Sequence, residues 1–112
     1  MVTVKHLLLK IEGCNKDLLS DEKFVIKAME DIANVLDVKV IKKLVHVFKP
    51  GLSIILLIAE SHIAFHSWPE YEMADIEIVT CKETSDLKKA LKIIVEKFKP
   101  KKVVKRSWIY KL

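Results

Sequence analysis

The middle of the sequence holds a run of side chains that could do chemistry. Hydroxyl, imidazole, carboxylate and thiol groups follow one another in Ser61, His62, His66, Glu70 and Cys81. A hydroxyl or thiol can act as a nucleophile or proton donor, and an imidazole or carboxylate can act as a general base. Each residue alone has an ordinary structural explanation, so their order and spacing are what predict a site.

An apolar strand should position this run. Residues 52–59 are rich in Ile and Leu and follow a turn at Pro50-Gly51, so we predict a strand that is buried on both faces. A second strand over 62–67 follows so closely that the two must form a sharp hairpin near Glu60-Ser61. A turn this tight would strain the backbone at Ser61.

The rest of the chain alternates strand and helix patterns. Further strands are predicted over residues 3–12, 38–48, 74–80 and 103–110. We expect Ser20 to cap a first helix, Thr84 or Ser85 to cap a second, and Lys99-Pro100 to end the second. The order β-α-β-β followed by β-β-α-β indicates an internal pseudo-repeat of the β-α-β-β type.

This succession predicts an α+β two-layer sandwich, with a mostly antiparallel sheet and two helices on one face. The 112 residues, of which 51% are hydrophobic and 31% charged, suit a single domain over 1–112 and argue against disorder. The second face of the sheet then needs a cover.

The composition also limits which classes of partner we expect. No apolar run approaches the ~18 residues that span a bilayer, and the N-terminus lacks a signal-peptide layout, so we expect a cytoplasmic protein without membrane contact. The net charge of +5 comes mostly from dispersed lysines without a recognisable nucleic-acid module, so we expect no nucleic acid. Cys14 and Cys81 have no metal-ligand spacing; we expect no metal site and a buried, structural Cys14.

Three segments and one upstream serine resemble the short prokaryotic form of S-adenosylmethionine decarboxylase, a self-processing enzyme that carries a pyruvoyl group. The match is close over residues 58–63, 66–71 and 80–81, with Ser53 eight residues before Ser61. Weaker likeness extends over most of the chain.

The resemblance implies that Ser61 attacks the carbonyl carbon of Glu60 and converts the peptide into an ester. Elimination and hydrolysis would then leave a pyruvoyl group in place of Ser61 and divide the chain into residues 1–60 and 61–112. It also implies that His66 serves processing as the base for elimination, and that Ser53 assists by hydrogen bonding near the scissile carbonyl.

For turnover, the resemblance implies a Schiff base between the pyruvoyl group and the substrate amine, with Cys81 as the proton donor after decarboxylation. Glu70 becomes a candidate for substrate contact, and Phe48 either stacks on adenine or is an ordinary core residue. The resemblance also implies a homodimer of processed protomers, paired through their sheets. His62 and His46 are left as structural or undecided, and Lys82 stands where members of the resembled family commonly have glycine.

The leading hypothesis is therefore a lyase that decarboxylates S-adenosylmethionine and supplies the aminopropyl donor for spermidine and other polyamines. A pyruvoyl-dependent arginine decarboxylase on the same scaffold is one alternative. The other is a basic binding module in which Ser61 is never processed.

Overall fold

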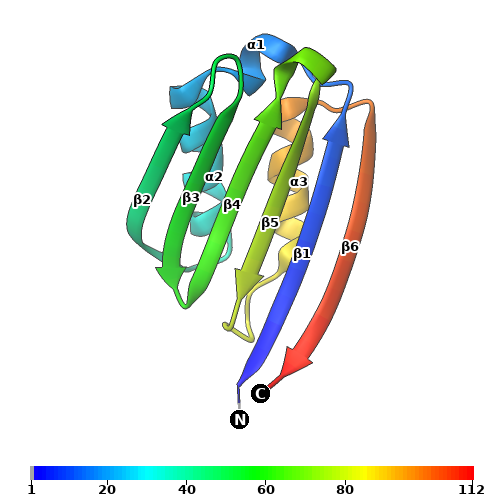
Figure 1. Cartoon of the computed structure of the whole chain (residues 1–112). Helices are drawn as coiled ribbons and strands as arrows, with labels where there is room; N and C mark the ends of the chain where they lie inside the picture. Colours follow the sequence, from blue (N-terminus) through cyan, green and yellow to red (C-terminus); the bar gives the residue numbers. More distant parts are fainter. Residues whose placement is uncertain (1) are drawn as a thin grey trace.

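The computed structural model describes residues 2–112 as one six-stranded sheet with its helices on one side (Figure 1). Every strand pairing is antiparallel, in the order β2-β3-β4-β5-β1-β6. The strands are β1 (Thr3–Glu12), β2 (Lys39–Val47), β3 (Leu52–Ala59), β4 (Ser61–Trp68), β5 (Met73–Thr80) and β6 (Lys102–Lys111). The predicted α+β two-layer sandwich is confirmed.

Two long helices, α2 (Glu22–Val35) and α3 (Leu87–Phe98), cover the sheet. A four-residue helix α1 (Lys16–Leu19) precedes α2, and a 3-10 turn η1 (Pro69–Tyr71) joins β4 to β5. Neither short element was predicted, because an element of three or four residues is too short to show a periodic pattern of apolar residues.

The predicted helix caps were wrong in residue, although each helix begins close to the predicted place. Asp21 caps α2 by accepting from the Phe24 N–H at 3.1 Å, and Asp86 caps α3. Ser20 instead ends α1, where its hydroxyl donates to the Lys16 carbonyl at 3.1 Å. Ser85 is buried and donates to the Leu36 carbonyl at 3.1 Å. Both serines are therefore occupied by other carbonyl groups.

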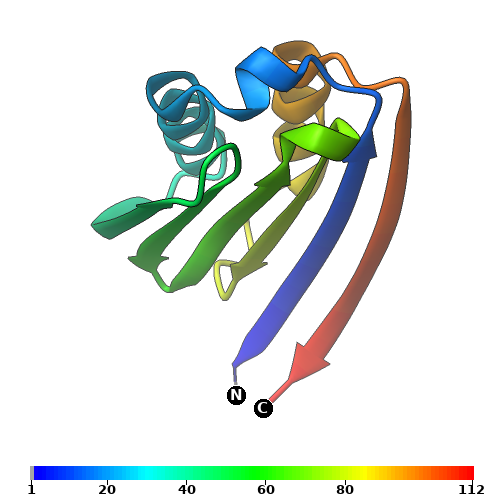
Figure 2. The same cartoon turned by 45° about the horizontal axis from the view of Figure 1, so that its top comes forward.

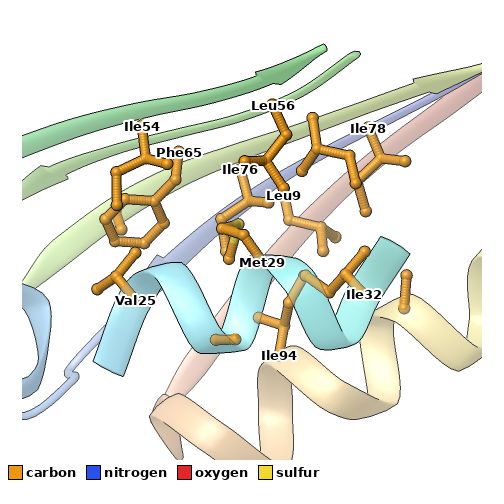
Figure 3. Packing of buried hydrophobic residues seen from close by; sticks show 14 of the residues in the cluster. Leu9, Val25, Met29, Ile32, Ile54, Leu56, Phe65, Ile76, Ile78 and Ile94 are labelled. Carbon is orange, nitrogen blue, oxygen red and sulfur yellow. The ribbon is translucent and has the colours of Figure 1, made fainter. Parts of the chain in front are cut away.

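The hydrophobic core lies between the sheet and the two long helices (Figure 3). Alternate residues of four strands face the helices, namely Leu9, Ile54, Leu56, Phe65, Ile76 and Ile78 among others. The helices contribute Val25, Met29 and Ile32 from α2 and Ile94 from α3. Burying each such side chain stabilises the fold by about 1.5–3 kcal/mol relative to leaving it exposed. The strands that carry the chemistry are thus fixed from the helix side.

Within residues 2–112, no helix or second sheet covers the opposite face of the sheet (Figure 2). Burial along β3 alternates, so the prediction of a strand buried on both faces fails for a single chain. Ile55 and Leu57 are 38% and 47% exposed, and Leu44, which pairs with Ile55, is 69% exposed. An apolar run indicates burial without saying which molecule provides the cover.

Two turns at opposite ends of β3 determine where side chains can gather. The β3–β4 turn has Glu60 as its single residue between strands. At the other end, the Phe48 N–H donates to the Gly51 carbonyl at 2.7 Å. A Cβ on Gly51 would lie 2.5 Å from the Ser67 carbonyl oxygen, so this turn packs against β4 only with glycine there.

Within residues 2–112, no helix is long and apolar enough to cross a membrane. The same residues contain no group of three or more His, Cys, Asp or Glu side chains arranged to hold a metal ion.

Candidate active site

Ser61 begins β4 directly after the one-residue turn, as the hairpin prediction required. Its backbone has φ 115°, a value that L-residues rarely adopt. Such a conformation costs on the order of 1–3 kcal/mol and persists only when the surrounding structure enforces it. Here the enforcement comes from the strands on either side, since Ser61 pairs with Ile58 of β3 and Thr80 of β5. The Glu60–Ser61 peptide is therefore held in a strained segment on a rigid support.

The carbonyl group of Glu60 already has a hydrogen-bond donor. The backbone N–H of Cys81, immediately after β5, donates to the Glu60 carbonyl oxygen at 3.3 Å. A donor in this position polarises the carbonyl and can stabilise negative charge on its oxygen if a nucleophile adds to the carbon. The backbone of the partly buried Cys81 thus contacts the predicted cleavage site.

The Cys81 loop is tied to the end of α2 by an ion pair. Lys82 Nζ lies 2.7 Å from Asp37 Oδ2 and donates to the Asp37 carbonyl at 2.6 Å, while the Lys82 N–H donates to Thr80 Oγ1 at 3.1 Å. Lys82 therefore has defined contacts on both sides of the segment. It constrains the segment that supplies the Cys81 N–H.

His62 contacts both neighbouring groups that could take part in proton transfer. Its Nδ1 lies 3.3 Å from Ser61 Oγ, and its Nε2 lies 3.3 Å from Glu77 Oε1 on β5. Neither contact was predicted. Adjacent strand residues ordinarily point to opposite faces, and only the positive φ of Ser61 brings its hydroxyl to the next side chain.

Ser53 and His66 form a second cluster. They are paired in register across β3 and β4, and Ser53 Oγ lies 2.6 Å from His66 Nδ1. This short contact fixes the imidazole ring on the face of the sheet that no helix covers. The two residues predicted to assist processing are thus brought together.

A cleft of about 430 Å³ collects the remaining predicted residues beside this pair. Its lining includes Phe48, Ser53, His66, Trp68 and Glu70. Phe48 is 64% exposed and its ring lies 4.5 Å from that of His46, so it is not a core residue of the single chain. The cleft therefore offers an aromatic face, an imidazole and a carboxylate to a small polar molecule.

The two clusters lie apart within one chain. Ser61 and His66 are on the same strand, and five residues of antiparallel strand span about 17 Å. The lining of the cleft includes none of Glu60, Ser61 and Cys81. One chain therefore presents the cleavage site at one end of the β3–β4 hairpin and the cleft at the other end.

Two other features lie outside these clusters. A larger cavity of about 560 Å³ between β1, β6 and α3 contains none of the predicted site residues. Cys14 is fully buried, and burial together with the Glu72 carboxylate raises the pKa of its thiol to about 11. Such a thiol stays protonated at neutral pH, which supports a structural Cys14.

Comparison with known proteins places this geometry in context. The family model described as S-adenosylmethionine decarboxylase matches residues 5–108. The S-adenosylmethionine decarboxylase proenzyme of Archaeoglobus fulgidus is 35% identical over 101 residues, covering 89% of this chain and 90% of the relative. That of Clostridium botulinum is 38% identical over 99 residues, covering 88% and 85% respectively.

The fold agrees with these sequence matches. A crystal structure of the adenosylmethionine decarboxylase from Aquifex aeolicus superposes with a TM-score of 0.87 at 25% identity, covering 96% of this chain and 89% of that one. The resemblance seen in the residues around Ser61 is thereby confirmed over nearly the whole chain. The protein belongs to the S-adenosylmethionine decarboxylase family.

Proposed function

We propose that the chain is a proenzyme that cleaves itself between Glu60 and Ser61 and then decarboxylates S-adenosylmethionine. The observation that carries the proposal is the environment of the Glu60 carbonyl. It accepts a hydrogen bond from the Cys81 N–H, and it precedes a serine with φ 115°. The similarity to S-adenosylmethionine decarboxylase proenzymes supports both steps.

The residues present fit a pyruvoyl group made from Ser61. Addition of Ser61 Oγ to the Glu60 carbonyl carbon would develop negative charge on the oxygen that Cys81 already contacts. Breaking the C–N bond then relieves the strained backbone at Ser61 and leaves an ester. Loss of the Ser61 Cα proton then expels the Glu60 carboxylate and leaves a dehydroalanine at position 61. Hydrolysis of this group releases ammonia and leaves the pyruvoyl group as the new N-terminus. When formed, the pyruvoyl group supplies an electron sink for decarboxylation of an amino acid.

The cleft is separate from the cleavage site, so the substrate and the residues that line the cleft must be brought to the new N-terminus at position 61. Because Ser53 and His66 lie about 17 Å from Ser61 within a chain, a second copy must bring its own cleft to the Cys81 end. The uncovered apolar face, with Leu44, Ile55 and Leu57 exposed, supports a homodimer formed face to face through the two sheets. We therefore place His66, as the elimination base, and the substrate-binding Phe48 and Glu70 opposite the partner's cleavage site.

Within that composite site, Cys81 is proposed to protonate the substrate carbon after CO₂ leaves. The exposed ring of Phe48 offers a stacking face for adenine, and Glu70 offers a carboxylate for ribose hydroxyls or for the cationic groups of the substrate. The product would be the aminopropyl donor used in the biosynthesis of spermidine and other polyamines.

Intact mass under denaturing conditions tests self-cleavage. We expect fragments corresponding to residues 1–60 and 61–112, the second with a blocked N-terminus, whereas Ser61→Ala should stay whole. A folded wild-type chain that remained intact after prolonged incubation would contradict the proposal.

Release of labelled CO₂ tests the substrate. We expect release from carboxyl-labelled S-adenosylmethionine and little from carboxyl-labelled arginine. Because base–aromatic stacking contributes about 1–3 kcal/mol, Phe48→Ala should raise KM by roughly tenfold. A preference for arginine would keep the cleavage mechanism and refute the proposed substrate.

A further inference from the structure

His62 lies at the centre of a chain of three contacting side chains at the bond to be cleaved. Ser61 Oγ is 3.3 Å from His62 Nδ1, and His62 Nε2 is 3.3 Å from Glu77 Oε1. One tautomer satisfies both contacts. With its proton on Nε2, the ring donates to the Glu77 carboxylate and leaves Nδ1 free to accept from the serine hydroxyl.

Addition of Ser61 to the Glu60 carbonyl requires a group that removes the hydroxyl proton, because a neutral hydroxyl is a weak nucleophile. The sequence contains four histidines, all described by the structure. Within one chain, only His62 contacts Ser61. His66 bonds to Ser53 at the far end of β4, His46 lies against Phe48, and His6 stacks on Trp108 at 4.7 Å. The proton acceptor best placed for this step is therefore His62.

We propose that His62, oriented by Glu77, is the general base for the first step of self-processing. This inference rests on the cleavage proposed above and adds a residue to it. His62 Nδ1 takes the proton as the bond forms between Ser61 Oγ and the Glu60 carbonyl carbon, and negative charge develops on the oxygen facing the Cys81 N–H. The C–N bond then breaks, and the imidazolium returns the proton to the Ser61 nitrogen. The step is an isomerisation, so no co-reactant is required.

This assignment separates the work of two histidines. His62 acts before the ester exists, on the Ser61 hydroxyl of its own chain. The role proposed for His66 comes later, on the Cα proton of Ser61. The two variants should therefore stop processing at chemically different species, which makes the division of labour measurable.

Glu77 is a positioning residue in this scheme. The side chains of His62 and Glu77 are 41% and 39% exposed in the single chain, so the pair gains little from electrostatic attraction in water. The value of the carboxylate lies in fixing the tautomer and the plane of the ring. Glu77→Gln can present either its amide oxygen or its amide nitrogen to Nε2, so it should slow processing less than loss of the imidazole does.

The test follows newly made chain, produced by cell-free synthesis, by intact mass with and without hydroxylamine. Loss of a general base typically slows a reaction by about 10²–10⁴-fold, and we expect His62→Ala to show a loss in this range. Uncleaved His62→Ala should resist hydroxylamine because its amide has not become an ester. Uncleaved His66→Ala should be split by hydroxylamine at Ser61.

His62→Asn distinguishes a base from a spacer. The Asn side chain can still hydrogen-bond to Ser61 Oγ but cannot take its proton, so this variant should process as slowly as His62→Ala. His6→Asn, which removes an imidazole from another strand in the same row of the sheet, should process at the wild-type rate.

Each outcome has a defined consequence. Wild-type speed in His62→Asn, or ester accumulation in His62→Ala, would overturn the role of His62 while leaving self-cleavage intact. Failure of the wild-type chain to cleave would instead refute the proposed function. Thermal unfolding of each variant checks that it folds. If His62→Ala is unfolded, the processing rates of His62→Asn and Glu77→Gln decide the question.

Discussion

Ser61 occupies a backbone conformation at φ 115° that the sequence alone could only suggest through the shortness of the hairpin. The resemblance supplied the residues for chemistry, and the structure adds their partners. Ser53 with His66, and the backbone of Cys81 with Glu60, are now defined contacts. The roles of these residues stay predictions. His62 could not be singled out beforehand, because sequence spacing does not reveal that one positive φ brings neighbouring side chains together.

The two contributions of Cys81 can be separated experimentally. Cys81→Ala keeps the backbone N–H on the Glu60 carbonyl, so we expect processing near the wild-type rate by intact mass. It removes the proposed proton donor, so CO₂ release should fall by about 10²-fold or more. Stray protonation should also convert the pyruvoyl terminus into alanine, visible as a mass change. Turnover at the wild-type rate would make the thiol structural.

Among the elements, strands were predicted more accurately than helix ends. Alternation along residues 74–80 correctly gave the two faces of β5, because the strand period of two leaves little choice. Helix caps were missed because Ser and Asp are nearly equivalent as N-caps, and tertiary contacts such as that of Ser85 with Leu36 decided between them. Burial on both faces of β3 was inferred from composition, which cannot distinguish a helix layer from a partner chain.

An ion pair between the two long helices should make stability depend on pH. Asp31 of α2 has its Oδ1 2.5 Å from Lys27 Nζ and its Oδ2 3.2 Å from Lys97 Nζ of α3. The hydrogen bond from Lys27, with a smaller contribution from Lys97, lowers the pKa of Asp31 below 3.8. A lowered carboxyl pKa stabilises the fold above the unfolded-state value, and this stabilisation is lost as pH falls through the folded-state value.

Asp31→Asn should therefore reduce the free energy of unfolding by up to about 1 kcal/mol at pH 7. The difference from wild type should shrink as pH falls below 3.8, where the native carboxyl also becomes protonated. Urea unfolding at several pH values measures it. A difference that did not depend on pH would assign the effect to packing.

The tie between Lys82 and Asp37 should affect the rate of processing more than stability. The two side chains are 35% and 91% exposed, so the pair adds little to the free energy of unfolding. Without it, the loop that supplies the Cys81 N–H is freer to move, and we expect Lys82→Ala to process several-fold more slowly by intact mass. Lys82→Arg, which keeps the charge, should recover most of the rate. Equal rates in all three chains would show that β5 alone positions this donor.

For the whole molecule, the decisive feature is the uncovered face of the sheet. Leu44, Ile55 and Leu57 lie on it between the two ends of the β3–β4 hairpin. Two sheets packed face to face would bury this patch, and we consider a two-fold axis that lies between them and runs across the strands. The same rotation would bring the His66 end of one chain to the Ser61 end of the other. Covering the apolar surface and completing the site are then one event.

Mixed dimers test this arrangement. His66→Ala keeps its cleavable serine, and Ser61→Ala keeps its histidine, so each variant alone should yield no processed chain. Coexpressed with different tags, they form heterodimers in which one composite site holds Ser61 and the other chain's His66. We expect the His66→Ala chain, and only that chain, to be cleaved to the pyruvoyl form. Leu44→Lys added to both chains should abolish this rescue and give monomers by light scattering, because the charge lies in the proposed interface. Absence of cleavage in verified heterodimers would mean that His66 does not act across the interface.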